Sequence, residues 1–138
     1  MNDIERLDAR VLVVEDDQDN RIVIERLLRL AGIGQDSYVA IEGDAATYLA
    51  GRSDTFDLVF LDLQLPKKDG YAIIAEIRMN PRLAALRVVA LTANVSHREV
   101  ERCRDAGFDG FIGKPIDGRR FSALLRKILK GEGVWMED

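Results

Sequence analysis

Three short, continuous apolar runs limit the folds open to this chain more than any other pattern. They are "RVLVV" at 10–14, "FDLVFL" at 56–61 and "LRVVAL" at 86–91. None alternates between apolar and polar residues, which is typical of strands buried on both faces, so we interpret them as parallel strands. Two shorter, more polar runs, "QDSYVA" at 35–40 and "GFDGFIG" at 107–113, suit the edges of the same sheet.

Helical periodicity fills the intervals between these runs. In the last interval, apolar residues recur at i, i+3, i+4 and i+7: Phe121, Leu124, Leu125 and Ile128. Ser96 and Glu99 have the spacing of a capping box, and Gly32 and Gly107 stand where helix C-termini need a left-handed residue. Strand and helix therefore alternate through five units. With right-handed crossovers this predicts an α/β fold, a doubly wound five-stranded parallel sheet with helices on both faces.

The length of 138 residues suits one domain with a single sizeable core. We expect an N-terminal extension at 1–9, a folded domain at 10–130 and a C-terminal tail at 131–138. The tail, "GEGVWMED", is too short to fold alone. Trp135 within it is either a loosely held terminal residue or a docking point on the domain or on a partner.

Composition and charge exclude several classes of function. Hydrophobic residues make up 47% and charged residues 32%, the mixture of a soluble globular protein. A net charge of −4 offers no basic stripe for nucleic acid or anionic lipid. The N-terminus lacks the apolar core of a signal peptide and no apolar run could cross a bilayer, so we expect a cytoplasmic protein. The single cysteine, Cys103, is expected to be a structural thiol.

One carboxylate interrupts the apolar stretch "VFLDLQLPKKDG" at 59–70. An ionised Asp62 at the end of a buried strand costs several kcal/mol unless it is paired. Other polar residues also follow the predicted strands directly: Glu15, Asp16 and Asp17, then Thr92, and then Lys114 with Pro115. In open α/β sheets the carboxyl ends of the strands form the site, and neighbouring strands lie about 4.8 Å apart. These side chains are therefore expected to share one small site.

The chemistry of this group favours a divalent cation. Carboxylates about 4 Å apart repel by roughly 4 kcal/mol per pair at an effective dielectric constant of 20, so a cluster shifts its pKa values or recruits a cation. Oxygen ligands without histidine or cysteine favour Mg²⁺, with Mn²⁺ as the alternative, and Mg²⁺ in turn predicts a phosphoryl group. Lys114 and Thr92 could stabilise the negative charge of that group, which leaves Asp62 as the nucleophile.

Four segments, "VLVVEDD", "LDLQLPKKDGY", "ALTA" and "GKP", together resemble the signature segments of response-regulator receiver domains of bacterial two-component signalling. The resemblance covers residues of about 10–130, and each segment closes a predicted strand. It implies a flavodoxin-like sheet with strand order 2-1-3-4-5.

The resemblance also implies a phosphoacceptor and a metal site. Asp62 would be the phosphorylated aspartate. Asp16 and Asp62 would bind Mg²⁺ directly, the backbone carbonyl of Gln64 would be a further ligand, and Glu15 would act through water. Asp17 matches no role in the family pattern, so we assign it to the loop or the helix start.

The resemblance assigns a second group to binding and sensing the phosphoryl group. Lys114 would bridge to a phosphoryl oxygen, and its bond to Pro115 is expected to be cis. Thr92 would move toward the phosphoryl group, helped by the backbone N–H of Ala93. Phe111 occupies the position of the switch aromatic, which is more often a tyrosine, and it can move only by packing.

The implied function is a signalling switch. A histidine kinase or a histidine phosphotransfer protein would donate its phosphoryl group to Asp62. The product would draw Thr92 and Phe111 inward and reshape the face made by the fourth helix, the fifth strand and the fifth helix, where a downstream protein would bind. We expect no enzyme activity beyond self-catalysed phosphoryl acceptance and slow autodephosphorylation. No fused output domain, direct nucleic-acid contact or membrane contact is expected, and a homodimer is left open.

Three other interpretations remain. The chain could be a phosphorelay intermediate or a receiver module excised from a hybrid histidine kinase. It could be a Mg²⁺-dependent phosphohydrolase of the haloacid-dehalogenase kind, but that class needs an aspartate two residues after the nucleophile, and Gln64 stands there. It could also be an unphosphorylated interaction module, although such a module has no use for the acidic cluster.

Overall fold

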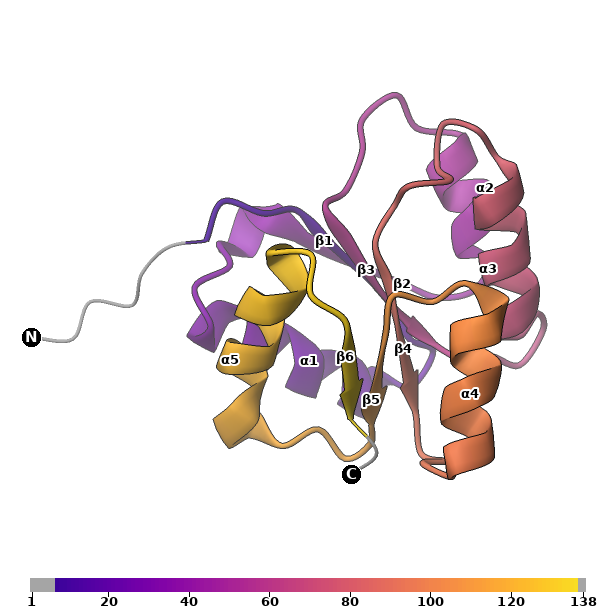
Figure 1. Ribbon diagram of the computed structural model, residues 1–138. Coiled ribbons are helices and arrows are strands. Elements are labelled where there is room, and N and C mark those ends of the chain that lie inside the picture. The colour runs from indigo at the N-terminus through magenta and orange to yellow at the C-terminus, as the bar shows by residue number, and fades with distance from the viewer. Residues whose placement is uncertain (1–6, 137–138) are drawn as a thin grey trace, which may run out of the picture.

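The computed structural model describes residues 7–136 (Figure 1). Residues 1–6 of the expected N-terminal extension and the last two residues of the tail lie outside the described residues. The elements, in chain order, are β1 (Val11–Val14), α1 (Gln18–Leu30), the 3₁₀ helix η1 (Gln35–Ser37), β2 (Tyr38–Ile41), α2 (Ala45–Ala50), β3 (Leu58–Asp62), α3 (Gly70–Met79), β4 (Val88–Thr92), α4 (His97–Ala106), β5 (Gly110–Gly113), α5 (Gly118–Leu129) and β6 (Val134–Met136). Strand and helix alternate as predicted up to α5.

The strands form one parallel sheet in the order β2-β1-β3-β4-β5-β6. The expected order of the first five strands, 2-1-3-4-5, is confirmed. The expected number of five strands is wrong, because Val134–Met136 of the tail adds a sixth strand beside β5 within the described part of the chain. A run of three residues is too short to be recognised as a strand from its pattern.

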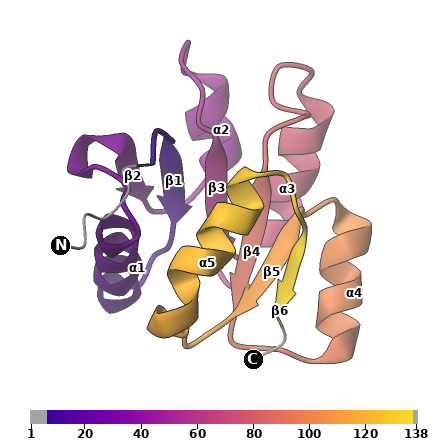
Figure 2. The same cartoon turned by 60° about the vertical axis from the view of Figure 1, so that its left-hand side comes forward.

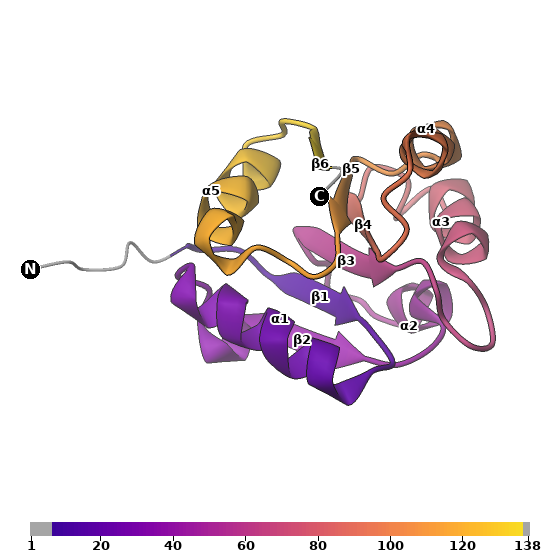
Figure 3. The same cartoon turned by 90° about the horizontal axis from the view of Figure 1, so that it is seen from below.

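The sheet lies between two helical layers. Helices α1 and α5 cover one face, and α2, α3 and α4 cover the other (Figure 3). Within β1, Val11 and Val13 pack on the α1 and α5 side, whereas Leu12 and Val14 pack on the opposite side. Each central strand is thus buried on both faces, which explains why its sequence is continuously apolar. Among the described residues, none of the helices has the length and apolar character needed to span a bilayer.

Helix ends follow the predicted signals. The Ser96 hydroxyl accepts a hydrogen bond from the backbone N–H of Glu99 at 3.2 Å and caps α4. Gly107 ends the same helix with φ +102°, and Gly32 follows α1 with φ +107°. Cys103 is buried, and its thiol lies 3.4 Å from the Tyr71 hydroxyl, as suits a structural cysteine.

Arg78, in the last turn of α3, ties three segments together. Its guanidinium donates to the carbonyl of Gly107 at 3.0 and 2.7 Å and to two carbonyl groups of the loop before β4. It also donates to the Asp109 carboxylate at 2.9 Å, and that carboxylate accepts the N–H of Val88 at 2.8 Å. The ends of α3 and α4 and the start of β4 are therefore fixed by one side chain.

Replacing Arg78 with methionine is expected to lower the free energy of unfolding by about 2–4 kcal/mol, because several partly buried carbonyl groups and Asp109 lose their donor. Urea unfolding followed by circular dichroism would measure this change. Arg98→Met, at an exposed position of α4, is the matched control and is expected to cost no more than about 0.5 kcal/mol. Equal losses in the two variants would contradict the role of Arg78.

Candidate functional site

The carboxyl ends of β1, β3 and β5 bring one lysine between two carboxylates. The Lys114 ammonium lies 3.0 Å from the Asp62 carboxylate and 3.1 Å from that of Glu15. These residues are 52 and 99 positions apart in sequence. Parallel pairing of β1 with β3, of β3 with β4 and of β4 with β5 places their ends at the same edge of the sheet. The predicted convergence of these three groups is present.

Asp62 is the last residue of β3 and is buried. Both oxygens of its carboxylate accept hydrogen bonds. Oδ2 accepts from the Lys114 ammonium at 3.0 Å, and Oδ1 accepts from the backbone N–H of Gln64 at 2.9 Å. These partners offset the cost of a carboxylate at the end of an apolar strand. The charge that interrupts this strand is therefore compensated by specific groups.

Glu15 is fully buried directly after β1, and it also contacts Lys114. Burial raises the pKa of the Glu15 carboxyl to about 7, and the neighbouring Asp62 carboxylate contributes to that rise. Hydrogen bonds from Asn20 and Lys114 act in the opposite direction. One ammonium group thus serves two carboxylates.

Asp16 and Gln64, the other expected metal ligands, are more accessible to solvent. The Asp16 carboxylate accepts from the backbone N–H of Gly43 at 3.1 Å. Within residues 7–136, no three side chains of histidine, cysteine, aspartate or glutamate are arranged to hold a metal ion by themselves. A metal here would need main-chain or exogenous oxygens in addition to the carboxylates. Asp17 caps α1 by accepting from the N–H groups of Asp19 and Asn20, as its assignment to the helix start requires.

Thr92 closes β4 and is buried beside the same edge. Its hydroxyl accepts from the N–H of Asn94 at 3.0 Å, and its carbonyl accepts from the N–H of Lys114 at 2.8 Å. Ala93 follows it and is exposed. The peptide bond between Lys114 and Pro115 is cis. Thr92 and Lys114 are thus linked through their backbones as well as placed at one edge.

Phe111 is fully buried in the core beneath α2, α3 and α4. Thr92 is also buried, with 1% of its surface exposed. Both residues are therefore already in an inward position in this structure, before any of the expected inward movement. Any response at Phe111 would have to be a repacking of side chains that already surround it.

Ion pairs that have no signature in the sequence hold the loops around the site. Arg21 donates to the carbonyl of Glu15 at 3.1 Å and pairs with Glu42 at 2.7 Å. Lys68, in the loop after β3, pairs with Asp44 at 2.9 Å and also with Glu76. The pairs Arg21–Glu42 and Lys68–Asp44 are 21 and 24 positions apart in sequence, and none of these contacts has a characteristic spacing. A hollow of about 570 Å³ lies between these loops and is lined by Asp16, Glu42, Gly43, Asp44, Leu65, Pro66, Lys67 and Lys68.

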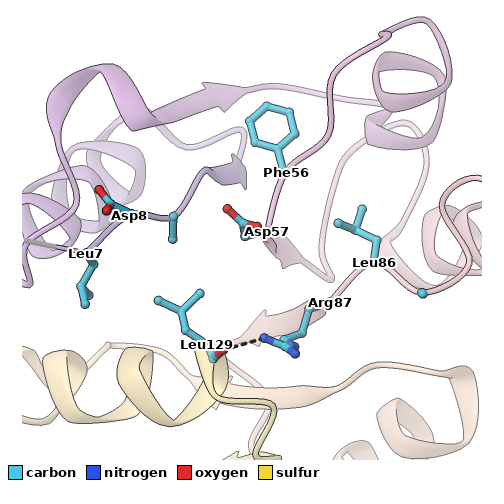
Figure 4. Close-up of a pocket in the computed structure, with 9 residues that line it drawn as sticks. Leu7, Asp8, Phe56, Asp57, Leu86, Arg87 and Leu129 are labelled. Carbon is cyan, nitrogen blue, oxygen red and sulfur yellow. Dashed lines mark hydrogen bonds between the residues drawn. The ribbon is translucent and has the colours of Figure 1, made fainter.

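Another hollow, of about 460 Å³, lies at the opposite end of the sheet (Figure 4). It is bordered by the segments that precede β1, β3 and β4 and by the end of α5. Arg87 reaches across it to donate to the carbonyl of Leu129 at 3.0 Å, which joins the start of β4 to α5. The residues with predicted chemical roles are all at the other end of the strands.

Comparison with known sequences gives one consistent family. The sequence profile described as "Response regulator receiver domain" matches residues 11–126. Hybrid signal transduction histidine kinase L of Dictyostelium discoideum is 32% identical over 128 residues, covering 91% of this chain and 8% of that protein. The DNA-binding dual master transcriptional regulator RpaA of Synechocystis sp. is 31% identical over 121 residues, covering 88% of this chain and 49% of that protein. The chain therefore spans from a small fraction to about half of these relatives.

Solved structures agree with the sequence comparison. The receiver domain of a signal transduction histidine kinase from Syntrophus aciditrophicus has a TM-score of 0.75 and 26% identity, covering 89% of this chain and 91% of that one. The receiver domain of sensor histidine kinase PA1611 from Pseudomonas aeruginosa has a TM-score of 0.71 and 27% identity, covering 88% and 98%. That crystal structure has a magnesium ion coordinated in its active site cleft.

Proposed function

We propose that this chain, which belongs to the response regulator receiver domain family, accepts a phosphoryl group on Asp62 and acts as a signalling switch. One observation carries the proposal. Lys114 reaches both Asp62 and Glu15 at about hydrogen-bond distance, from a position far along the chain. This arrangement unites a carboxylate nucleophile with a fixed positive charge at the edge of the sheet where receiver-like folds bind ligands.

The reaction needs little from the protein beyond position and charge. A carboxylate oxygen of Asp62 would attack the phosphorus atom of a phosphohistidine, the P–N bond would break, and the imidazole would leave and take up a proton. Lys114 would stabilise the negative charge on the phosphoryl oxygens, and the hydroxyl of Thr92 would offer a further hydrogen bond. The N–H of Gln64 fixes the orientation of the Asp62 carboxylate before the reaction.

The oxygen ligands at this edge fit a Mg²⁺ ion. Asp16, Asp62 and the backbone carbonyl of Gln64 would hold it, with Glu15 acting through water, and no nitrogen or sulfur ligand is needed. When bound, the ion would neutralise charge on the phosphoryl oxygens. The geometry supports this fit, because the single Lys114 ammonium is shared by the Glu15 and Asp62 carboxylates.

A histidine kinase or a histidine phosphotransfer protein is the proposed donor, and a downstream protein is the proposed reader. A relay role is the second candidate, because relatives such as kinase L are named as hybrid histidine kinases. Multiple-turnover hydrolysis is not proposed, because Gln64 occupies the position at which the phosphohydrolase class needs an aspartate.

Acetyl phosphate provides a direct test. Incubation of the chain with acetyl phosphate and Mg²⁺ is expected to add the mass of one phosphoryl group, and the same incubation with excess EDTA is expected to leave the mass unchanged. Intact-protein mass spectrometry measures both outcomes. An unmodified mass under conditions that label a known receiver domain would contradict the proposal. Sustained turnover of phosphomonoesters would favour a hydrolase instead.

A further inference from the structure

The tail strand β6 occupies the outer edge of β5. Val134 is paired with Gly110, Trp135 with Phe111 and Met136 with Ile112, all in parallel. In Figures 1 and 2 this strand lies beside β5, with α5 on one side and α4 on the other. Without β6, β5 would be the edge strand of the sheet, with a row of unpaired backbone groups. The tail therefore covers the middle of the face formed by α4, β5 and α5.

The part of β5 that contacts β6 leaves room for a closely approaching backbone at Gly110. A Cβ atom added at Gly110 would lie 2.8 Å from the carbonyl oxygen of Val134 and 3.6 Å from its nitrogen. Real Cβ atoms essentially never approach a backbone oxygen this closely, so a side chain at position 110 would push β6 away. Glycine in a buried strand is otherwise unfavourable, and close approach of another backbone is the reason for it here.

Two side chains anchor the strand to opposite layers. Val134 is 4% exposed and packs in the core shared by the sheet, α1 and α5. Trp135 is partly buried against the other core, and the Arg104 guanidinium of α4 lies 4.5 Å from the centre of its ring. The strand thus contacts both helical layers through two successive residues, which point to opposite faces of the sheet, as in a strand bound at a sheet edge.

The attachment of this strand is nevertheless short. Three residues pair with β5, and the connection from α5 is an exposed segment, Gly131 to Gly133, in which Gly131 has φ +91°. Short segments with few buried apolar contacts belong to the parts of a fold that open first. A competing extended segment could therefore take its place while the rest of the sheet remains intact.

We propose that β6 is an exchangeable occupant of a strand-binding edge, and that a partner protein binds by placing its own extended segment on β5 in parallel. The segment would carry an aliphatic or β-branched residue at the position of Val134 and an aromatic residue next to it, over Arg104. The link to signalling rests on the proposed function, because β5 leads directly to Lys114 at the phosphoryl site.

Tryptophan fluorescence tests whether β6 depends on Gly110 for its place beside β5, because Trp135 is the only tryptophan in the chain. Gly110→Ala is expected to release β6, shift the emission to longer wavelength and increase quenching by acrylamide about threefold, as for an exposed indole. Gly51→Ala, where an added Cβ would make only ordinary contacts, is the matched control and is expected to leave the emission unchanged. Circular dichroism confirms that both variants fold. Unchanged quenching in folded Gly110→Ala would overturn the proposal.

A peptide tests the exchange. Trp135→Pro keeps the full chain but disables the tail strand and removes the only tryptophan, so the fluorescence of an added peptide GEGVWMED reports its own binding. This variant is expected to bind the peptide at least about tenfold more tightly than the wild-type chain, whose tethered tail competes. Because the wild-type chain contains its own tryptophan, its affinity is measured with a fluorescein-labelled peptide. The affinity of Trp135→Pro is measured with the same labelled peptide for direct comparison. The double variant Gly110→Ala/Trp135→Pro is expected not to bind.

Three results would overturn the proposal: equal affinity for wild type and Trp135→Pro, undiminished binding by the double variant, or dimerisation of Trp135→Pro in place of peptide binding. None of these measurements uses phosphorylation. A chain that binds the peptide but is not labelled by acetyl phosphate would therefore disprove the proposed function alone, and the converse pattern would disprove only the strand exchange.

Discussion

The Asp62→Asn variant is expected to show no mass increase with acetyl phosphate and Mg²⁺ under conditions in which the wild-type chain is labelled completely. An amide oxygen is a poor nucleophile and a weaker ligand for a hard cation than a carboxylate. The substitution keeps the shape of the side chain, and the amide oxygen can still accept from the backbone N–H of Gln64. The expected loss is therefore chemical, and the circular dichroism spectrum is expected to stay that of the wild type.

Asp17→Asn is the matched control, because it removes a carboxylate from the same acidic cluster without touching the proposed nucleophile. Asp17 caps α1, and asparagine caps helices about as well as aspartate. Labelling of this variant is expected to match that of the wild type. Labelling of Asp62→Asn at the wild-type level would place the phosphoryl group on another residue and disprove the assignment.

Much of the fold was predictable because the central strands are buried on both faces. The runs at 10–14, 56–61 and 86–91 correspond to β1, β3 and β4 with small shifts at their ends. Their alternate residues pack into two separate cores, and that arrangement requires a continuous apolar pattern. The site was predictable for a related reason, since parallel strands bring their carboxyl ends to one edge whatever their distance in sequence.

The remaining features depend on contacts that have no local signature. β6 rests on three residues whose partner strand begins 24 positions earlier, and the glycine that admits it, Gly110, is indistinguishable in sequence from a turn glycine. The burial of Phe111 depends on a core to which α2, α3 and α4 all contribute side chains. The pairing of Lys68 with Asp44 and Glu76 likewise follows from the positions of loops. Such features become visible only when the tertiary structure is known.

Replacing Lys114 with methionine is expected to slow labelling by acetyl phosphate about 10²- to 10³-fold, the usual cost of removing one fixed group that stabilises transition-state charge. The ammonium lies 3.0 Å from the Asp62 carboxylate and 3.1 Å from the Glu15 carboxylate. Lys67→Met, at an exposed position in the loop after β3, is the matched control and is expected to keep the wild-type rate. Time courses of intact mass with Mg²⁺ measure all three rates.

The same variant separates the chemical role of Lys114 from its structural one. Without the ammonium, Glu15 and Asp62 are two buried carboxylates that have lost their shared counterion, and unfolding in urea is expected to become easier by about 3 kcal/mol. Adding Asp62→Asn to Lys114→Met removes one of these charges, so the double variant is expected to be more stable than Lys114→Met alone. A double variant that is no more stable than Lys114→Met would show that repulsion between the Glu15 and Asp62 carboxylates does not limit the stability of this site. That repulsion could then not be the reason for the site to recruit a cation.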